Sequence, residues 1–204
     1  MSIWRIGWTR RWWVLVGLAL VALVVAVGWG GDLVVIPSSD GPRTIRQMVV
    51  ALLPCLIAPV LVDQMPTVSG TLVRVTALAW LERLGCVVVI FGVSAVAWWA
   101  LPGLFPGSGW YEFGVACALT AIALAGTARW GSGGVLATCA VALGWLMAGD
   151  TVAGVMGFQT VVLPDIPALP VVRAAVSVTL CVLALIVALV LSSSSWWRAV
   201  DPGR

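Results

Sequence analysis

Long apolar runs separated by short polar gaps make up almost the whole chain, and the charged residues fall in the gaps. A helix needs about 20 apolar residues to cross a bilayer, so each run is a candidate transmembrane helix. The expected spans are residues 12–29, 47–62, 84–101, 111–128, 135–148 and 173–191. The pattern therefore predicts an all-α, polytopic membrane protein, with six transmembrane helices in a single transmembrane domain over residues 1–204.

Two of the gaps differ from ordinary turns. Residues 63–83 are the least apolar internal stretch and include an amphipathic segment. They predict either a short helix at the membrane surface that docks a partner, or the polar start of a long third helix. Residues 149–172 contain several prolines and glycines but are too apolar for a free linker. This composition favours a re-entrant or interfacial loop over an ordinary surface loop.

The first and second spans have distinctive features of their own. A basic, tryptophan-rich amphipathic lead-in, residues 2–13, precedes the first span, and no convincing cleavage site follows it. We therefore expect an uncleaved first span. The second span contains Pro54 and Pro59. Because proline removes a helical hydrogen bond, we expect this span to kink or partly unwind.

The arginines predict the orientation. With the N-terminus inside, eight of the 11 basic residues, all arginines, lie on the inner side, and only Arg43, Arg46 and Arg173 lie outside. By the positive-inside rule, the N- and C-termini are both cytoplasmic and the protein is a multi-pass protein of the plasma membrane.

The tryptophans agree with this assignment. Most of the 13 fall at the ends of expected spans, as in the aromatic belts of membrane proteins. A tryptophan-lined ligand site is the alternative interpretation, and Trp80 and Trp145 lie away from the belts.

The composition mainly excludes classes of function. Apolar residues are 62% of the chain and charged residues 9%, and there is no histidine. No phosphate-binding GxxxxGK[ST] motif is present, and no acid or base lies at the middle of a span. The arginines are too dispersed for a nucleic-acid patch. We therefore expect a non-enzymatic chain without its own cofactor or metal, and no self-powered ion-coupled carrier.

Two residue types leave alternatives open. The five cysteines form no CxxC pair and are interpreted as apolar filler, with metal or redox use as the alternative. Small residues in the fourth and fifth spans permit close helix packing, either within the subunit or across a dimer interface. These small residues are Gly114, Ala118, Ala121, Gly126, Ala137, Ala140 and Gly144.

With these features together, the chain resembles the membrane subunit of a type-two ABC transporter. The lead-in at residues 2–13 and six spans with both ends inside carry part of the likeness. Residues 69–72 read Ser-Gly-Thr-Leu, similar to the family's Gly-Thr-Leu coupling segment. Residues 162–170 form a proline-rich apolar loop where the family has short re-entrant helices. Val73 stands where the family often has an acid, and residues 65–68 replace the acids that often precede the segment.

The resemblance implies how such a subunit would be driven. Two copies, or this chain and a homologous permease subunit, would sit on cytosolic ATPase subunits that hold the ATP and magnesium. Gly70, Thr71, Arg74, Glu82 and Arg83 would form the segment that couples ATPase motion to the spans.

The resemblance also implies a substrate path. Pro54 and Pro59 of the second span and Trp145 of the fifth would line it. The expected function is a permease subunit of an ABC exporter that moves a hydrophobic or amphipathic substrate, in contact with membrane lipid and with no nucleic acid.

Three further classes stay open, the last of which is an ion-coupled carrier or channel. The first is a non-transporting integral membrane assembly or structural subunit of a larger complex. The second is a membrane enzyme, which would have to use carboxylates near the outer face. Those carboxylates are Asp32, Glu112, Asp150 and Asp165.

Overall fold

The computed structural model describes residues 3–37, 39–62, 73–100, 108–157 and 169–193. Side chains are described for residues 13–37, 39–62, 83–96, 109–149, 151–157 and 174–192. Within these ranges the chain is mostly helical, with one short hairpin.

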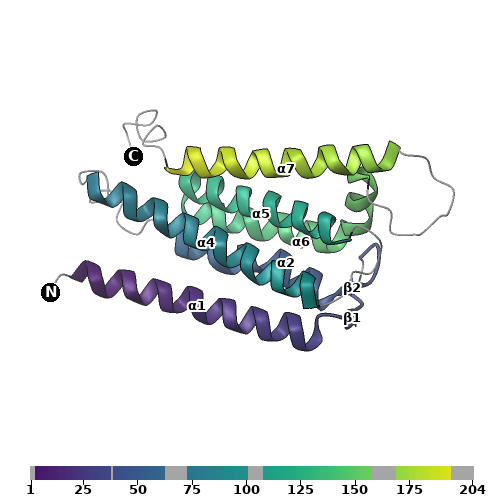
Figure 1. Ribbon diagram of the computed structural model, residues 1–204, viewed down its shortest axis with the longest axis horizontal. Helices are drawn as coiled ribbons and strands as arrows, with labels where there is room; N and C mark the ends of the chain where they lie inside the picture. Colours follow the sequence, from purple (N-terminus) through teal and green to yellow (C-terminus); the bar gives the residue numbers. More distant parts are fainter. Residues whose placement is uncertain (1–2, 38, 63–72, 101–107, 158–168, 194–204) are drawn as a thin grey trace.

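The described helices form one bundle, and all of them run roughly along its long axis (Figure 1). They are α1 (Ile3–Trp29), α2 (Ile45–Leu61), α4 (Val73–Ala100), α5 (Ser108–Trp130), α6 (Ser132–Met156) and α7 (Leu169–Ser193). The start of α1 and the end of α7 lie at the same end of the bundle. The opposite end carries β1 (Leu33–Val34) and β2 (Arg43–Thr44), and it is called the hairpin end below.

Three described helical segments are long and apolar enough to cross a membrane: Gly109–Trp130, Ser132–Gly149 and Ala174–Ser192. Shorter apolar helical segments cover Trp13–Trp29, Ile45–Leu61 and Arg83–Val96. The chain is therefore a mostly helical protein with candidate membrane-spanning helices.

Several helices extend beyond the apolar runs that predicted them. α1 begins at Ile3, so the lead-in continues directly into the first helix. α4 begins at Val73, so the second half of residues 63–83 is the polar start of a long helix. α6 continues to Met156, into the stretch expected to be a loop. Hydropathy marks where a helix can meet lipid, whereas a helix itself needs only backbone hydrogen bonds and no breaker, so the helices can be longer than the runs.

The prolines of α2 do not unwind it. The helix is continuous from Ile45 to Leu61 with Pro54 and Pro59 inside it. Non-helical backbone occurs in α6 instead, at Ala148. Of the two outcomes expected for the second span, a kink or partial unwinding, the unwinding is therefore wrong for the described structure.

The centre of the bundle is α5. Most of its spanning segment is buried, whereas little of the corresponding segment of α7 is buried. α5 packs against α2, α6 and α7, and α1 packs against α2 and α4 at the other side. The large exposed apolar side chains of α1 and α7, such as Leu20 and Leu180, suit contact with lipid.

Glycine brings α5 and α6 into backbone contact. The turn between them uses Gly131, whose φ of 55° lies in the left-handed region. A Cβ added to Gly134 would lie 2.0 Å from the carbonyl carbon of Gly126. In lipid, where burial of apolar surface does not drive association, such close packing is a main source of helix–helix attraction. This contact is within the subunit.

We expect Gly134→Ala to destabilise the protein by about 3 kcal/mol, because backbone atoms cannot move aside as a flexible side chain can. Thermal unfolding in detergent measures the effect. Gly133→Ala is the matched control, since the nearest atom to its added Cβ, the Cβ of Trp130, is 3.4 Å away. Equal stability of the two variants would contradict the close contact.

Candidate functional site

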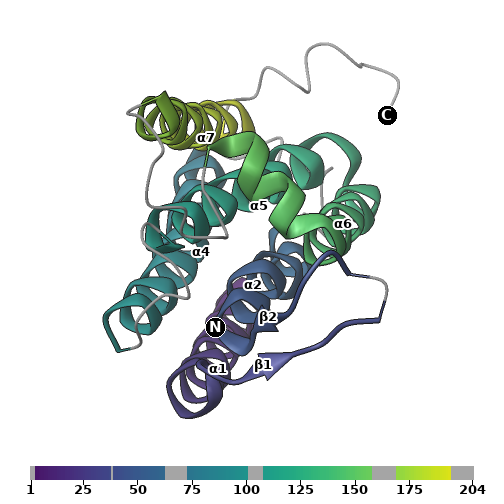
Figure 2. The ribbon, with the colours of Figure 1, turned by 90° about the vertical axis from the view of Figure 1, so that its right-hand side faces the viewer.

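Helix α6 is broken near the hairpin end. Ala148 has φ −117° and ψ 27°, outside the helical region, and joins two helical pieces. Figure 2 shows the last part of α6 turning across the hairpin end toward α7. The hydroxyl of Ser177 in α7 donates to the carbonyl oxygen of Met156 at 3.1 Å. A break of this kind interrupts the helical hydrogen-bond pattern, and at membrane depth the affected backbone groups need other partners.

Three residues outside α6 supply such partners; we call Asp40, Arg43 and Tyr111 the kink clasp. Arg43 Nε donates to the carbonyl oxygen of Leu146 at 3.2 Å. The backbone N–H of Asp40 donates to the carbonyl oxygen of Met147 at 2.9 Å. On the other side of the break, the Tyr111 hydroxyl donates to the carbonyl oxygen of Gly149 at 2.7 Å.

The Asp40 carboxylate completes the clasp. Its Oδ2 accepts the backbone N–H of Thr151 at 2.7 Å, and its Oδ1 forms an ion pair with Arg43. A carboxylate at the N-terminal end of a helical piece also meets the positive end of its dipole. The loop before β2 therefore binds both pieces of α6.

Gly149 lets the clasp close. Arg43 is only 2% exposed, and a Cβ on Gly149 would lie 3.0–3.1 Å from its guanidinium. Glycine thus allows the planar guanidinium to lie directly against the α6 backbone.

The hairpin holds Arg43 in place. β1 and β2 are antiparallel, with Val34 opposite Arg43. Thr44 begins α2 with a capping box in which its hydroxyl accepts the N–H of Gln47 and its own N–H donates to the Gln47 side chain. The N–H groups of Ile45 and Arg46 also donate to the carbonyls of Asp32 and Gly30, in the turn that follows α1.

A second ion pair joins α2 to α5 beside the clasp. Arg46 Nη2 lies 2.7 Å from Glu112 Oε1, and these side chains are 3% and 0% exposed. Two charges removed from water are stable only when closely paired, so this contact constrains where α2 and α5 can sit.

The pKa of the Asp40 carboxyl is lowered. Burial by itself would raise it, but the hydrogen bonds from Thr151 and the charge of Arg43 outweigh that effect. The ionised form of Asp40 is therefore favoured in the folded protein.

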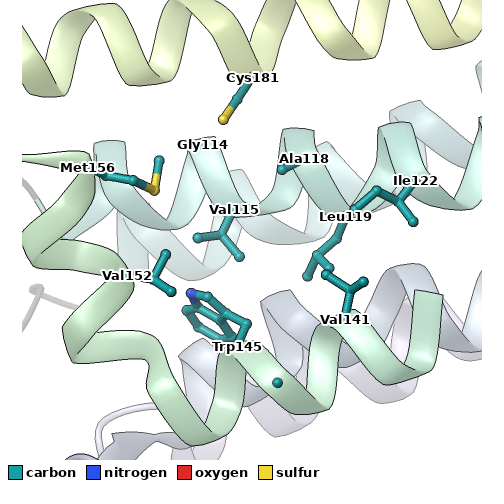
Figure 3. A pocket seen from close by; sticks show the side chains of 11 residues that line it. Gly114, Val115, Ala118, Leu119, Ile122, Val141, Trp145, Val152, Met156 and Cys181 are labelled. Atoms are coloured by element: carbon teal, nitrogen blue, oxygen red, sulfur yellow. The ribbon is translucent and has the colours of Figure 1, made fainter. Parts of the chain in front are cut away.

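An apolar pocket of about 390 Å³ lies between α5, α6 and α7 (Figure 3). Its lining residues are Gly114, Val115, Ala118, Leu119, Ile122, Val141, Gly144, Trp145, Val152, Met156 and Cys181. Val115 and Leu119 form a buried floor on α5, while Val141 and Gly144 on α6 are exposed at the rim. The α6 wall comes from both sides of the break at Ala148, so the shape of the pocket depends on the kink.

Trp145 connects the pocket to the clasp. Its indole N–H donates to the Tyr111 hydroxyl at 2.6 Å, and that hydroxyl donates onward to Gly149. The two rings are 6.0 Å apart between centroids. One hydrogen-bonded chain therefore runs from the pocket wall to the broken helix.

The residues expected to carry function are dispersed. Among the expected substrate-path residues, Trp145 lines the pocket, whereas Pro54 is buried in the core and Pro59 is exposed, and neither belongs to the lining. The expected coupling residues Gly70 and Thr71 lie outside the described residues.

The other expected coupling residues, Arg74, Glu82 and Arg83, are all on α4. Of the outer carboxylates, Glu112 is in the ion pair with Arg46, and Asp32 is exposed. Asp165 and the side chain of Asp150 lie outside the described part.

The clasp was not predicted from the sequence, although two signals pointed toward it. Arg43 and Arg46 are exceptions to the positive-inside distribution, and such exceptions need a partner in the fold. Tyr111 is the only tyrosine in the chain. The pairing of Arg46 with Glu112, 66 positions apart, could not be predicted without the packing of α2 on α5.

Among the described residues, no group of three or more histidine, cysteine, aspartate or glutamate side chains could hold a metal ion. All five cysteines are free, and Cys55, Cys86 and Cys117 are buried. The described residues thus provide an apolar pocket, and the clasp supports one wall of it through Tyr111 and Trp145.

We expect Glu112→Gln or Arg46→Met to cost about 3–5 kcal/mol, because each leaves one buried charge without its partner. The double variant should recover part of the loss. Unfolding in detergent measures the cycle, with the exposed Asp32→Asn as a control that changes stability little. Additive single effects would contradict direct coupling.

Because the pKa of Asp40 is lower in the folded state, its stabilising effect is fully present above the usual carboxyl pKa of about 3.9 and is lost as pH falls through the folded value. We expect Asp40→Asn to be less stable than the native chain at pH 7, and the difference to shrink at pH 3. A difference that stays constant across this range would contradict the ionised clasp.

Comparisons with known proteins found no match to a protein-family model, a curated protein or a solved structure. Function is therefore inferred from the sequence pattern, the clasp and the pocket.

Proposed function

We propose that this chain is the membrane-embedded permease subunit of an exporter that moves a hydrophobic or amphipathic substrate, with ATP hydrolysed on a separate cytosolic subunit. A second copy or a homologous permease subunit would complete the membrane part. In this proposal the chain crosses the plasma membrane six times, with both termini in the cytoplasm. The start of α1 and the end of α7 lie at the same end of the bundle, which supports placing both termini on one side of the membrane.

The observation that carries the proposal is the pocket between α5, α6 and α7. It is lined entirely by apolar residues and glycines, and its floor on α5 is buried while its α6 rim is exposed. A site with these walls suits a molecule that partitions into the bilayer. Trp145, expected on the substrate path from the sequence, is part of its wall.

The placement of charge supports an external energy source. The buried charged side chains among the described residues are Arg43, Arg46 and Glu112, all at the hairpin end and all in ion pairs or hydrogen bonds. None lines the pocket. An ion-coupled carrier would place ionisable groups at its central site, so a partner ATPase acting on the inner segments is the better explanation.

A non-transporting assembly subunit is the second candidate. The broad exposed apolar faces of α1 and α7 favour it, because they offer large surfaces to other membrane proteins. Purification from native membranes distinguishes the two: a cytosolic ATPase should accompany a permease, and a complex without any nucleotide-binding subunit supports the assembly role.

For the permease, we expect Ala118→Phe to lower substrate-stimulated ATPase activity of the purified complex by about tenfold, because the larger ring occupies the pocket and removes about 1.4 kcal/mol of binding. Gly92→Leu is the control, since its added Cβ meets nothing within 4 Å and it lies outside the pocket. Equal stimulation of both variants would exclude the pocket as the substrate path.

Coupling is tested separately at the inner segment. We expect Gly70→Trp and Thr71→Trp to leave assembly intact but to uncouple ATP hydrolysis from transport. Full coupling in both variants would remove the docking role of residues 69–72.

A further inference from the structure

We propose that the pocket between α5, α6 and α7 holds one hydrocarbon chain of a membrane lipid, which enters sideways between α6 and α7. This inference rests on the proposed function in treating the pocket as the substrate path, and it names the substrate class as a molecule with a long alkyl chain. It concerns binding alone, so it can be tested without an ATPase or nucleotide.

The elongated shape of the pocket suits one hydrocarbon chain of a lipid. Its α5 residues extend from Gly114 to Ile122, which at 1.5 Å per residue is roughly 12 Å along the helix axis. Figure 3 shows Gly114 and Met156 toward one end and Ile122 and Val141 toward the other. A space elongated along the bundle axis is parallel to the direction in which lipid chains lie in a bilayer.

The walls offer no hydrogen bond to a polar ligand. The one strong side-chain donor in the lining, the indole N–H of Trp145, already donates to Tyr111. Met156 and Cys181 add polarizable sulfur atoms, and the long flexible Met156 side chain can adapt to a mobile chain. A ligand with polar groups along its length would lose its hydration here without compensation.

The surroundings determine the occupant. Val141 is 45% exposed and Gly144 is exposed at the α6 rim, and Met147, about one helical turn from Gly144, is exposed as well. In a membrane this rim meets lipid hydrocarbon. A dry void of about 390 Å³ would deprive its lining of van der Waals partners, so the adjacent lipid chain is the molecule that fills it.

The polar end of the bound lipid points toward the hairpin end. Gly114 is six residues from the start of α5, which lies at that end, whereas Ile122 is deeper in the bundle. The clasp holds Trp145 and the second piece of α6 at this end of the pocket. Release of the clasp would therefore change the width of the pocket around the hydrocarbon chain of the lipid.

The experiment uses the full chain in nanodiscs containing a phosphatidylcholine with a photoreactive diazirine at mid-chain, followed by mapping of the labelled peptides. We expect labelling concentrated on residues 114–122 and 141–156, well above that of the exposed α1 face at residues 14–27. A soluble alkyl diazirine without a headgroup is the second probe. Labelling by this probe alone would assign the site to a free hydrophobic compound and overturn the lipid.

Two variants from different walls test the site itself. We expect Gly144→Leu and Ala118→Phe each to reduce pocket labelling roughly tenfold, equivalent to about ten lost heavy-atom contacts. Gly92→Leu, outside the pocket, should leave it unchanged. Chromatography and thermal unfolding confirm that each variant is folded.

The outcomes separate this inference from the proposed function. Equal labelling of α1 and the pocket, or no effect of either variant, means ordinary annular lipid and overturns the inference. Specific labelling in a chain that never associates with an ATPase would overturn the permease proposal and leave lipid binding in place.

Discussion

The need to satisfy backbone hydrogen bonds at the break in α6 is the constraint on which the site depends. Ala148 lies at the end of the candidate span Ser132–Gly149, where the backbone groups that the break frees still need hydrogen-bond partners. Asp40, Arg43 and Tyr111 supply them on both sides of Ala148. This requirement explains why a chain so poor in charge keeps Asp40 and Arg43 close together in the hairpin between α1 and α2.

The clasp and the ion pair next to it make one continuous support for the pocket. Arg46 and Glu112 fix α2 against α5, and the hairpin places Arg43 beside Gly149. From Gly149 the hydrogen bonds continue through Tyr111 to Trp145 in the pocket wall. A chain of hydrogen bonds thereby connects the hairpin end to the wall of the apolar pocket.

Much of the architecture was predictable because lipid restricts the possible structures so strongly. Apolar runs had to be helices, since only helices and closed barrels satisfy their backbone in a bilayer. The small residues of the fourth and fifth spans indicated close packing, and one of them, Gly126, contacts Gly134, a residue that the sequence had placed in the turn before the fifth span. The prolines of α2 do not unwind it, because proline removes a hydrogen bond locally while the packing of neighbouring helices can keep the helix continuous.

The sequence by itself determined that the chain is helical and apolar enough for a membrane, because composition and run length act locally and do not depend on partners. Only the tertiary structure decided that Arg46 meets Glu112, that Asp40 and Arg43 hold the break in α6, and that Trp145 faces a pocket. These contacts join residues far apart in the chain. Their geometry follows from how three helices pack, and no local pattern encodes that packing.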